Sequence, residues 1–130
     1  MNIGELSDKS GVSARMIRKY EEQGLIPKAR RTDAGYRRYK EEDVHVLGFV
    51  RRARLLGFSM KEIKLLLGLL NNKARTSAQV KKITARHMEE LRKKKQEIDR
   101  MLRTLVELSR KCPGDAGADC AILDGIAGRS

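Results

Sequence analysis

The sequence has few of the features that mark membrane proteins, secreted proteins and enzymes. No apolar run in its 130 residues approaches the length of about 20 that a membrane-spanning helix needs. The first residues, 1–5, lack the basic-then-apolar pattern of a signal peptide. No paired carboxylates, nucleophile–base set or phosphate-binding loop stands out. We therefore expect a cytoplasmic protein that is not an enzyme and does not associate with a membrane.

Cysteine is scarce as well, since the chain has only Cys112 and Cys120. They bracket a short segment with no third cysteine and no histidine. Cytoplasmic thiols stay reduced, which makes a disulfide between them the minor interpretation. Zinc normally takes four ligands, whereas two thiolates suit linear coordination of Cu(I), Ag(I) or Au(I). The pair therefore predicts one such ion per loop, and a copper-handling protein or a thiol redox switch remains the alternative.

Positive charge is abundant and unevenly distributed. The net charge is +12, which favours a polyanion such as nucleic acid as the partner. Residues 14–40 hold nine basic and three acidic side chains, whereas residues 112–130 hold three aspartates and a single arginine. The basic and the sulfur-bearing functions are therefore expected at opposite ends of the chain.

Two short helices joined by a glycine turn are predicted near the start of the chain. Ile3 and Leu6 mark an amphipathic helix that breaks at Gly11, and Ser13 is a candidate N-cap for the next helix, over 14–22. This second helix has cations on one face and apolar residues on the other, which is typical of a helix-turn-helix. The predicted outer residues are Arg15, Arg18 and Lys19, and the inner ones are Met16, Ile17 and Tyr20.

The next segment predicts a wing and two more helices. A turn at 33–35 lies between arginine-rich and tyrosine-rich stretches, which predicts a small β-hairpin. Helices are expected over 41–56 and 60–70, with Ser59 and Glu62 forming a capping box. The sequence therefore predicts a winged helix-turn-helix DNA-binding domain over 1–70, followed by a linker over 71–76.

A long helix is predicted over 77–111, where neither proline nor glycine occurs. Apolar residues occupy six of nine heptad positions from Val80 to Leu108. A single helix cannot bury such a stripe, so pairing with a second chain is expected, and a homodimer would present two recognition helices to a palindromic site. The expected dimer residues are Val80, His87, Leu91, Ile98, Met101 and Leu105.

Six segments in order along the chain carry a resemblance to a known family. They are 1–4, 17–26, 31–39, 51–59, 77–81 and the two ends of the loop 112–120. With these segments the chain resembles the MerR family of metal-responsive transcription regulators and, within it, the copper-efflux regulators. Three departures are visible: Lys19 replaces a frequent aromatic residue, Ala121 replaces a common proline, and a tail rich in cysteine and histidine is missing.

The resemblance implies a mainly α fold and a set of contacts with double-stranded promoter DNA. The long helix is expected to form an antiparallel coiled coil in the dimer, and residues 112–130 a metal-binding loop with a short helix. Together with the cationic faces described above, the resemblance predicts the following DNA-binding residues: Ser13, Arg15, Arg18, Lys19, Tyr20, Arg31, Tyr36, Arg37 and Arg54.

The resemblance also identifies Cys112 and Cys120 as the metal ligands. Divalent-ion sensors of the family place a cysteine where this chain has Ser77, so a third thiolate is absent. Two thiolates and a +1 ion leave a charge of −1 that must be offset, and Lys81 is the expected neighbour for this task. Metal is expected to change the preferred shape of the promoter, and RNA polymerase to respond indirectly, when residues 121–127 dock as a short helix.

Overall fold

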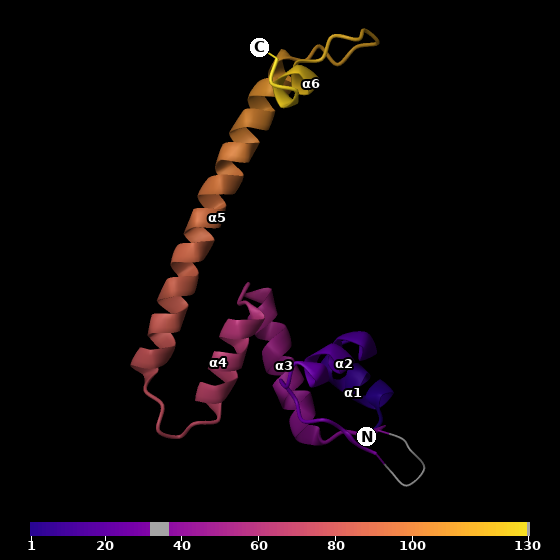
Figure 1. Ribbon diagram of the computed structural model, residues 1–130, viewed down its shortest axis with the longest axis vertical. Coiled ribbons are helices and arrows are strands. Elements are labelled where there is room, and N and C mark those ends of the chain that lie inside the picture. The colour runs from indigo at the N-terminus through magenta and orange to yellow at the C-terminus, as the bar shows by residue number, and fades with distance from the viewer. Residues whose placement is uncertain (32–36, 130) are drawn as a thin grey trace. The chain divides into compact units, whose positions relative to one another are not determined.

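The chain folds mainly into helices, as predicted (Figure 1). A computed structural model describes residues 1–31 and 37–129. The chain divides into two compact units, Met1–Ile83 and Thr84–Ser130. The elements are α1 (Ile3–Ser10), α2 (Ala14–Glu22), β1 (Arg30–Arg31), β2 (Arg37–Arg38), α3 (Glu41–Leu55), α4 (Met60–Leu70), α5 (Ser77–Lys111) and α6 (Ala121–Ile126).

The two predicted short helices are present and are capped by their own side chains. Asn2 Oδ1 accepts a hydrogen bond from the Glu5 N–H at 2.8 Å at the start of α1. Gly11 ends this helix with a φ of 74°, a conformation that favours glycine. Ser13 Oγ accepts from the Met16 N–H at 3.3 Å and begins α2, as predicted. The turn between the helices is therefore fixed by local sequence signals.

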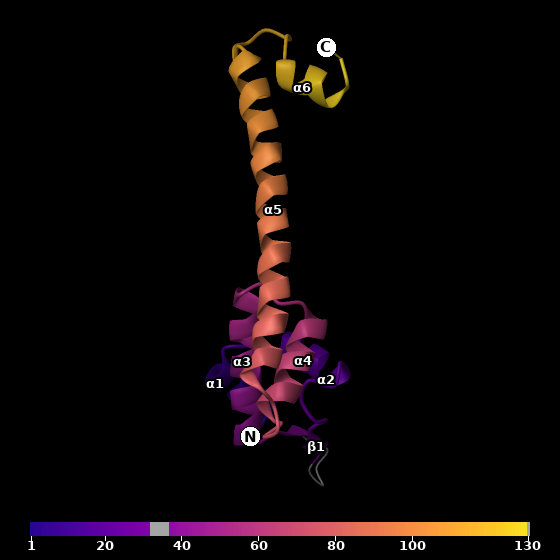
Figure 2. The same cartoon turned by 90° about the vertical axis from the view of Figure 1, so that its left-hand side faces the viewer.

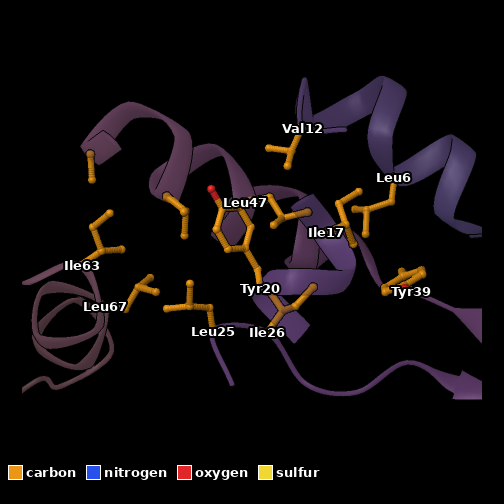
Figure 3. Close-up of a cluster of buried hydrophobic side chains, with 12 residues drawn as sticks. Leu6, Val12, Ile17, Tyr20, Leu25, Ile26, Tyr39, Leu47, Ile63 and Leu67 are labelled. Atoms are coloured by element: carbon orange, nitrogen blue, oxygen red, sulfur yellow. The ribbon is translucent and has the colours of Figure 1, made fainter. Parts of the chain in front are cut away.

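Apolar side chains from four helices and from the segments between them form the core of the first unit (Figure 3). In this unit α1 packs against α2 and α3, and α3 packs against α4. Burial of these side chains is the main force that holds the short helices together, because helices of this length are marginal in isolation. The fully buried members are Leu6, Ile17, Ile26, Leu47, Val50 and Ile63.

The strands and the two following helices also agree with the sequence prediction. β1 and β2 pair antiparallel, with Arg30 opposite Arg38 and Arg31 opposite Arg37. The predicted turn at 33–35 lies outside the described residues. The Ser59–Glu62 capping box of α4 is formed in both directions, at 2.9 and 3.2 Å. α3 ends at Leu55, one residue before the predicted end, because Leu56 forms its C-cap.

The second unit contains α5 from Thr84 onward and the short helix α6, which lies beside the end of α5 (Figure 2). Leu108 touches this helix at Gly125, where an added Cβ would lie only 2.5 Å from Leu108 Cδ2. α6 ends at Ile126 with Ala127 as its C-cap, within a residue of the prediction. Among the described residues, no helix combines the length and the apolar character that crossing a membrane requires.

Candidate functional site

The structure brings Cys112 and Cys120 together. Cys112 follows the last residue of α5, and Cys120 is the N-cap of α6. Their sulfur atoms lie 3.8 Å apart, within hydrogen-bonding range, and both thiols are free and half-buried. Inside the loop, the Asp115 carboxylate accepts from the Gly117 N–H at 2.8 Å, and Gly114 adopts a φ of 67°. These turns return the chain so that the second cysteine faces the first.

Local hydrogen bonding lowers the pKa of the Cys120 thiol below its ordinary value. The largest cause is the backbone N–H of Leu123 in α6, while partial burial acts in the opposite direction. The Cys112 thiol and the Ile122 N–H lower the pKa further, and the charge of Asp124 raises it. This environment therefore favours the thiolate of Cys120, which is the form of cysteine that binds metals.

This donor set fits a soft metal ion. It consists of two sulfur atoms that one ion can reach, and the chain has no other cysteine. The two residues expected to surround the ion, Ser77 and Lys81, lie in the first two turns of α5 and are exposed. Their role beside the metal stays a prediction.

The predicted cationic face of α2 is exposed to solvent. Arg15, Arg18 and Lys19 are all exposed, and Ser13 is exposed while it caps the helix. Arg54, in the last turn of α3, is exposed as well. Their contacts with DNA stay predictions, and the surface that they need is present.

Tyr20 has a different environment from the cations beside it. Its side chain is only 5% exposed, and its ring lies among the core residues (Figure 3). The inner position predicted from the helical spacing is therefore confirmed, and the structure gives Tyr20 a packing role. The further prediction, that Tyr20 contacts DNA, stays untested.

The remaining predicted DNA contacts fall on the wing. Arg31 and Arg37 are opposite each other in the paired strands. Their side chains lie outside what the structure describes, and so does Tyr36.

One buried residue beside this surface was missed by the sequence analysis. Glu21, in the last turn of α2, is 8% exposed and accepts hydrogen bonds from the Ala29 N–H and the Tyr39 hydroxyl. Its spacing of four residues from Ile17 places both on one helix face, which was the available signal.

The predicted dimer seam is largely uncovered in the single chain. Ile98, Met101 and Leu105 are 60%, 62% and 51% exposed, and Leu91 is 41% exposed. His87 differs, because it is buried at 4% exposure within the chain itself. A contact of His87 with a partner chain therefore stays a prediction, as does the role of the half-buried Val80.

Comparison with known proteins identifies the family. The family described as "MerR HTH family regulatory protein" matches residues 1–70, and the family described as "MerR, DNA binding" matches residues 44–108. This chain belongs to the MerR family. Members of this family are transcription regulators that bind promoter DNA, so the helix-turn-helix and its cationic surface belong to a DNA-binding regulator.

Three relatives illustrate the similarity of this MerR-family chain. The "Heavy metal-dependent transcription regulator 2" of Rhizobium meliloti (strain 1021) is 51% identical over 130 residues, which cover 100% of this chain and 88% of the relative. The regulator CueR of Yersinia pestis is 40% identical over 98% of this chain and 92% of its own length. The crystal structure of PbrR691 from Ralstonia metallidurans CH34 with lead(II) has a TM-score of 0.81 and 31% identity, covering 97% of this chain and 98% of that one.

Proposed function

We propose that this protein is a Cu(I)- or Ag(I)-responsive regulator that binds promoter DNA as a dimer and activates genes for copper efflux or resistance. The observation that supports the metal most directly is the two-thiol pair, with its sulfur atoms 3.8 Å apart. A pair of soft thiolates suits two-coordinate binding of a monovalent coinage metal, whereas Zn²⁺ normally takes four ligands. The relatives named as heavy metal-dependent regulators support metal control in general.

Cys112 and Cys120 would hold the ion, and the surroundings of Cys120 favour the deprotonated sulfur that it needs. The ion supplies a link between the end of α5 and the start of α6. Because Cys120 is the N-cap of α6, the position of this helix depends on the sulfur pair. α6 is therefore the element through which we expect metal binding to act.

The exposed stripe of α5 supports assembly into a homodimer through a coiled coil of the two long helices. Ile98, Met101 and Leu105 would be buried there, which removes an apolar surface that is unfavourable in water. A helix of 35 residues is about 50 Å long, so Ser77 and Lys81 cannot lie beside the thiols that follow its other end. Their predicted role at the metal therefore requires the antiparallel partner helix.

Control of DNA shape is the proposed mechanism of activation. Metal-free and metal-bound dimers would bind the same operator through Arg15, Arg18 and the wing, and metal would change the preferred DNA conformation. Smooth bending of a site costs on the order of 1–6 kcal/mol, and allosteric coupling typically supplies about 1–3 kcal/mol. The two magnitudes are compatible, and RNA polymerase would respond to the reshaped promoter without direct contact.

The alternative of a copper carrier or a thiol redox switch is not favoured, because the named relatives are transcription regulators. A reporter with a copper-exporter promoter, titrated separately with Cu(I), Ag(I), Au(I) and Zn²⁺, tests the proposal. We expect activation by the monovalent ions and none by Zn²⁺. Activation by Zn²⁺ alone, or by hydroperoxide in the absence of metal, would contradict it.

A further inference from the structure

The Glu21 carboxylate connects the recognition helix α2 to both ends of the β-hairpin. Its Oε1 accepts a hydrogen bond from the Ala29 backbone N–H at 2.7 Å, and its Oε2 accepts from the Tyr39 hydroxyl at 3.1 Å. Ala29 immediately precedes β1, and Tyr39 immediately follows β2. A single side chain of α2 therefore holds the hairpin at both of its stems.

The contact between Glu21 and Tyr39 is buried. A carboxylate in this place is unfavourable unless its hydrogen-bond donors are correctly positioned. Glu21 is 8% exposed and Tyr39 is 4% exposed. A carboxylate removed from water is unfavourable unless donors satisfy its oxygens, and hydrogen bonds to a charged acceptor are stronger than neutral ones. Two of its donors come from the two stems of the hairpin, so both of these hydrogen bonds form when both stems lie against α2.

Among the described residues, the hairpin is also held by Met1, at one of its two stems. Its ladder consists of the pairs Arg30–Arg38 and Arg31–Arg37, and a two-stranded hairpin is marginally stable by itself in water. Outside the ladder, the Tyr39 N–H donates to the Met1 carbonyl at 2.7 Å, and the Met1 ammonium donates to the Tyr39 carbonyl at 2.8 Å, so both bonds hold the stem that follows β2. Glu21 is the described side chain that joins both stems to the helix carrying Arg15 and Arg18.

We propose that Glu21 is a positioning residue that fixes the wing relative to α2, so that the arginines of both elements reach DNA phosphates at the same time. The inference rests on the DNA binding described above, and Glu21 itself does not touch DNA. Loss of its carboxylate should release the wing and its phosphate contacts while the contacts of α2 persist.

The salt dependence of operator binding measures the loss of phosphate contacts directly. Each phosphate contact that is lost reduces the slope of log K against log salt concentration by about 0.9. With a duplex selected by the wild-type protein from random DNA, we expect Glu21→Ala to lower affinity by about tenfold to a hundredfold at moderate salt. The slope should fall by about two in a dimer that loses one phosphate contact per wing. An unchanged slope would overturn the proposal.

Three further variants separate positioning from a general loss of folding. Glu21→Gln keeps an oxygen that can accept from Ala29 and gains an amide N–H that can donate to the Tyr39 hydroxyl oxygen, so its slope should stay near that of the wild type. Tyr39→Phe removes one of the two donors and should give about half of the loss in slope; it carries the test if Glu21→Ala does not fold. Ser59→Ala removes the N-cap of α4 and lowers stability by a typical cap contribution, but it should leave the slope unchanged.

Amide hydrogen exchange provides a readout that does not involve DNA. In Glu21→Ala the Ala29 amide should exchange at least tenfold faster, because its acceptor is gone, while the Ile17 amide, bonded to the Ser13 carbonyl at 2.9 Å, should not change. Equal protection of Ala29 in both proteins would overturn the proposed link.

Failure of this inference differs from failure of DNA binding. If Arg18→Ala leaves operator binding at the wild-type level, the proposed DNA surface is contradicted. If Arg18→Ala weakens operator binding but Glu21→Ala leaves the salt slope unchanged, only the role of Glu21 is overturned.

Discussion

The sulfur atoms of Cys112 and Cys120 lie 3.8 Å apart across the loop that joins α5 to α6. This separation lets one ion contact both sulfurs, and such an ion would link the end of α5 to the start of α6. The proposed DNA-binding surface belongs to other elements, α2, the wing and α3. The two activities should therefore be separable by mutation.

Replacing either cysteine should abolish the response to metal without removing DNA binding. In Cys112→Ser or Cys120→Ser one thiolate remains, which cannot form the two-sulfur site. We expect transcription activation by Cu(I) and Ag(I) to fall to the metal-free level in a reporter assay, with operator affinity within about twofold of the wild type by gel shift. Activation by copper in both single variants would show that the cysteines are not the sensing ligands.

The Cys120 thiol should ionise at a lower pH in the folded protein than in the unfolded chain. The Leu123 N–H, the largest cause, lowers its folded pKa. The resulting contribution to stability is fully present above the unfolded pKa and is lost as pH falls through the folded pKa. The folded Cys112→Ser variant keeps the Leu123 donor beside Cys120. Iodoacetamide should therefore begin to alkylate Cys120 at a lower pH in the folded variant than in the same variant in urea, as followed by mass spectrometry.

A matched comparison uses the same variant with and without denaturant, because the thiol and the reagent are then identical. Coincident alkylation profiles in the two conditions would mean that α6 does not stabilise the thiolate.

Much of the fold was predictable because the signals that end helices are local. Gly11, Ser13 and Ser59 act through neighbouring backbone groups, so their roles follow from the sequence alone. The start of α5 has such a signal too, which the sequence analysis missed: Thr76 and Gln79 exchange hydrogen bonds at 2.9 and 3.2 Å.

The features that escaped prediction depend on contacts between distant segments. Glu21 reaches Tyr39, eighteen residues away, and a helical wheel gives only its inward direction. The contact between Gly125 and Leu108 likewise requires α6 to turn back on α5. The cysteine pair could be identified from the sequence because its two members belong to one short loop, although the distance between them could not.

Assembly through the α5 stripe should be disrupted by a charge at its centre. Leu91→Lys removes an apolar side chain worth about 1.5–3 kcal/mol per chain when buried, so the dimer dissociation constant should rise by roughly a hundredfold or more. Light scattering at micromolar concentration measures it. Val106→Lys is the matched control, since Val106 is 57% exposed and lies off the heptad stripe. A wild-type monomer, or equal effects of both variants, would contradict the proposed seam.

Gly125 should be required for the geometry of the metal loop. An added Cβ would lie 2.5 Å from Leu108 Cδ2 and 2.9 Å from Leu108 Cδ1, closer than such atoms approach. In Gly125→Val, the Leu108 side chain or α6 must shift, and any displacement of α6 carries Cys120, its N-cap, with it. We expect a weaker response to Cu(I) in the reporter assay, by about tenfold or more in the concentration required, with unchanged operator affinity.

The double variant Gly125→Val/Leu108→Ala tests the cause of that loss. Shortening Leu108 removes the clashing methyl groups, so the double variant should recover much of the metal response, although Leu108→Ala alone leaves a gap under α6. Restoration by the second substitution is expected only if the two side chains meet at this contact. A double variant that is as unresponsive as Gly125→Val would mean that Gly125 acts through something other than its packing against Leu108.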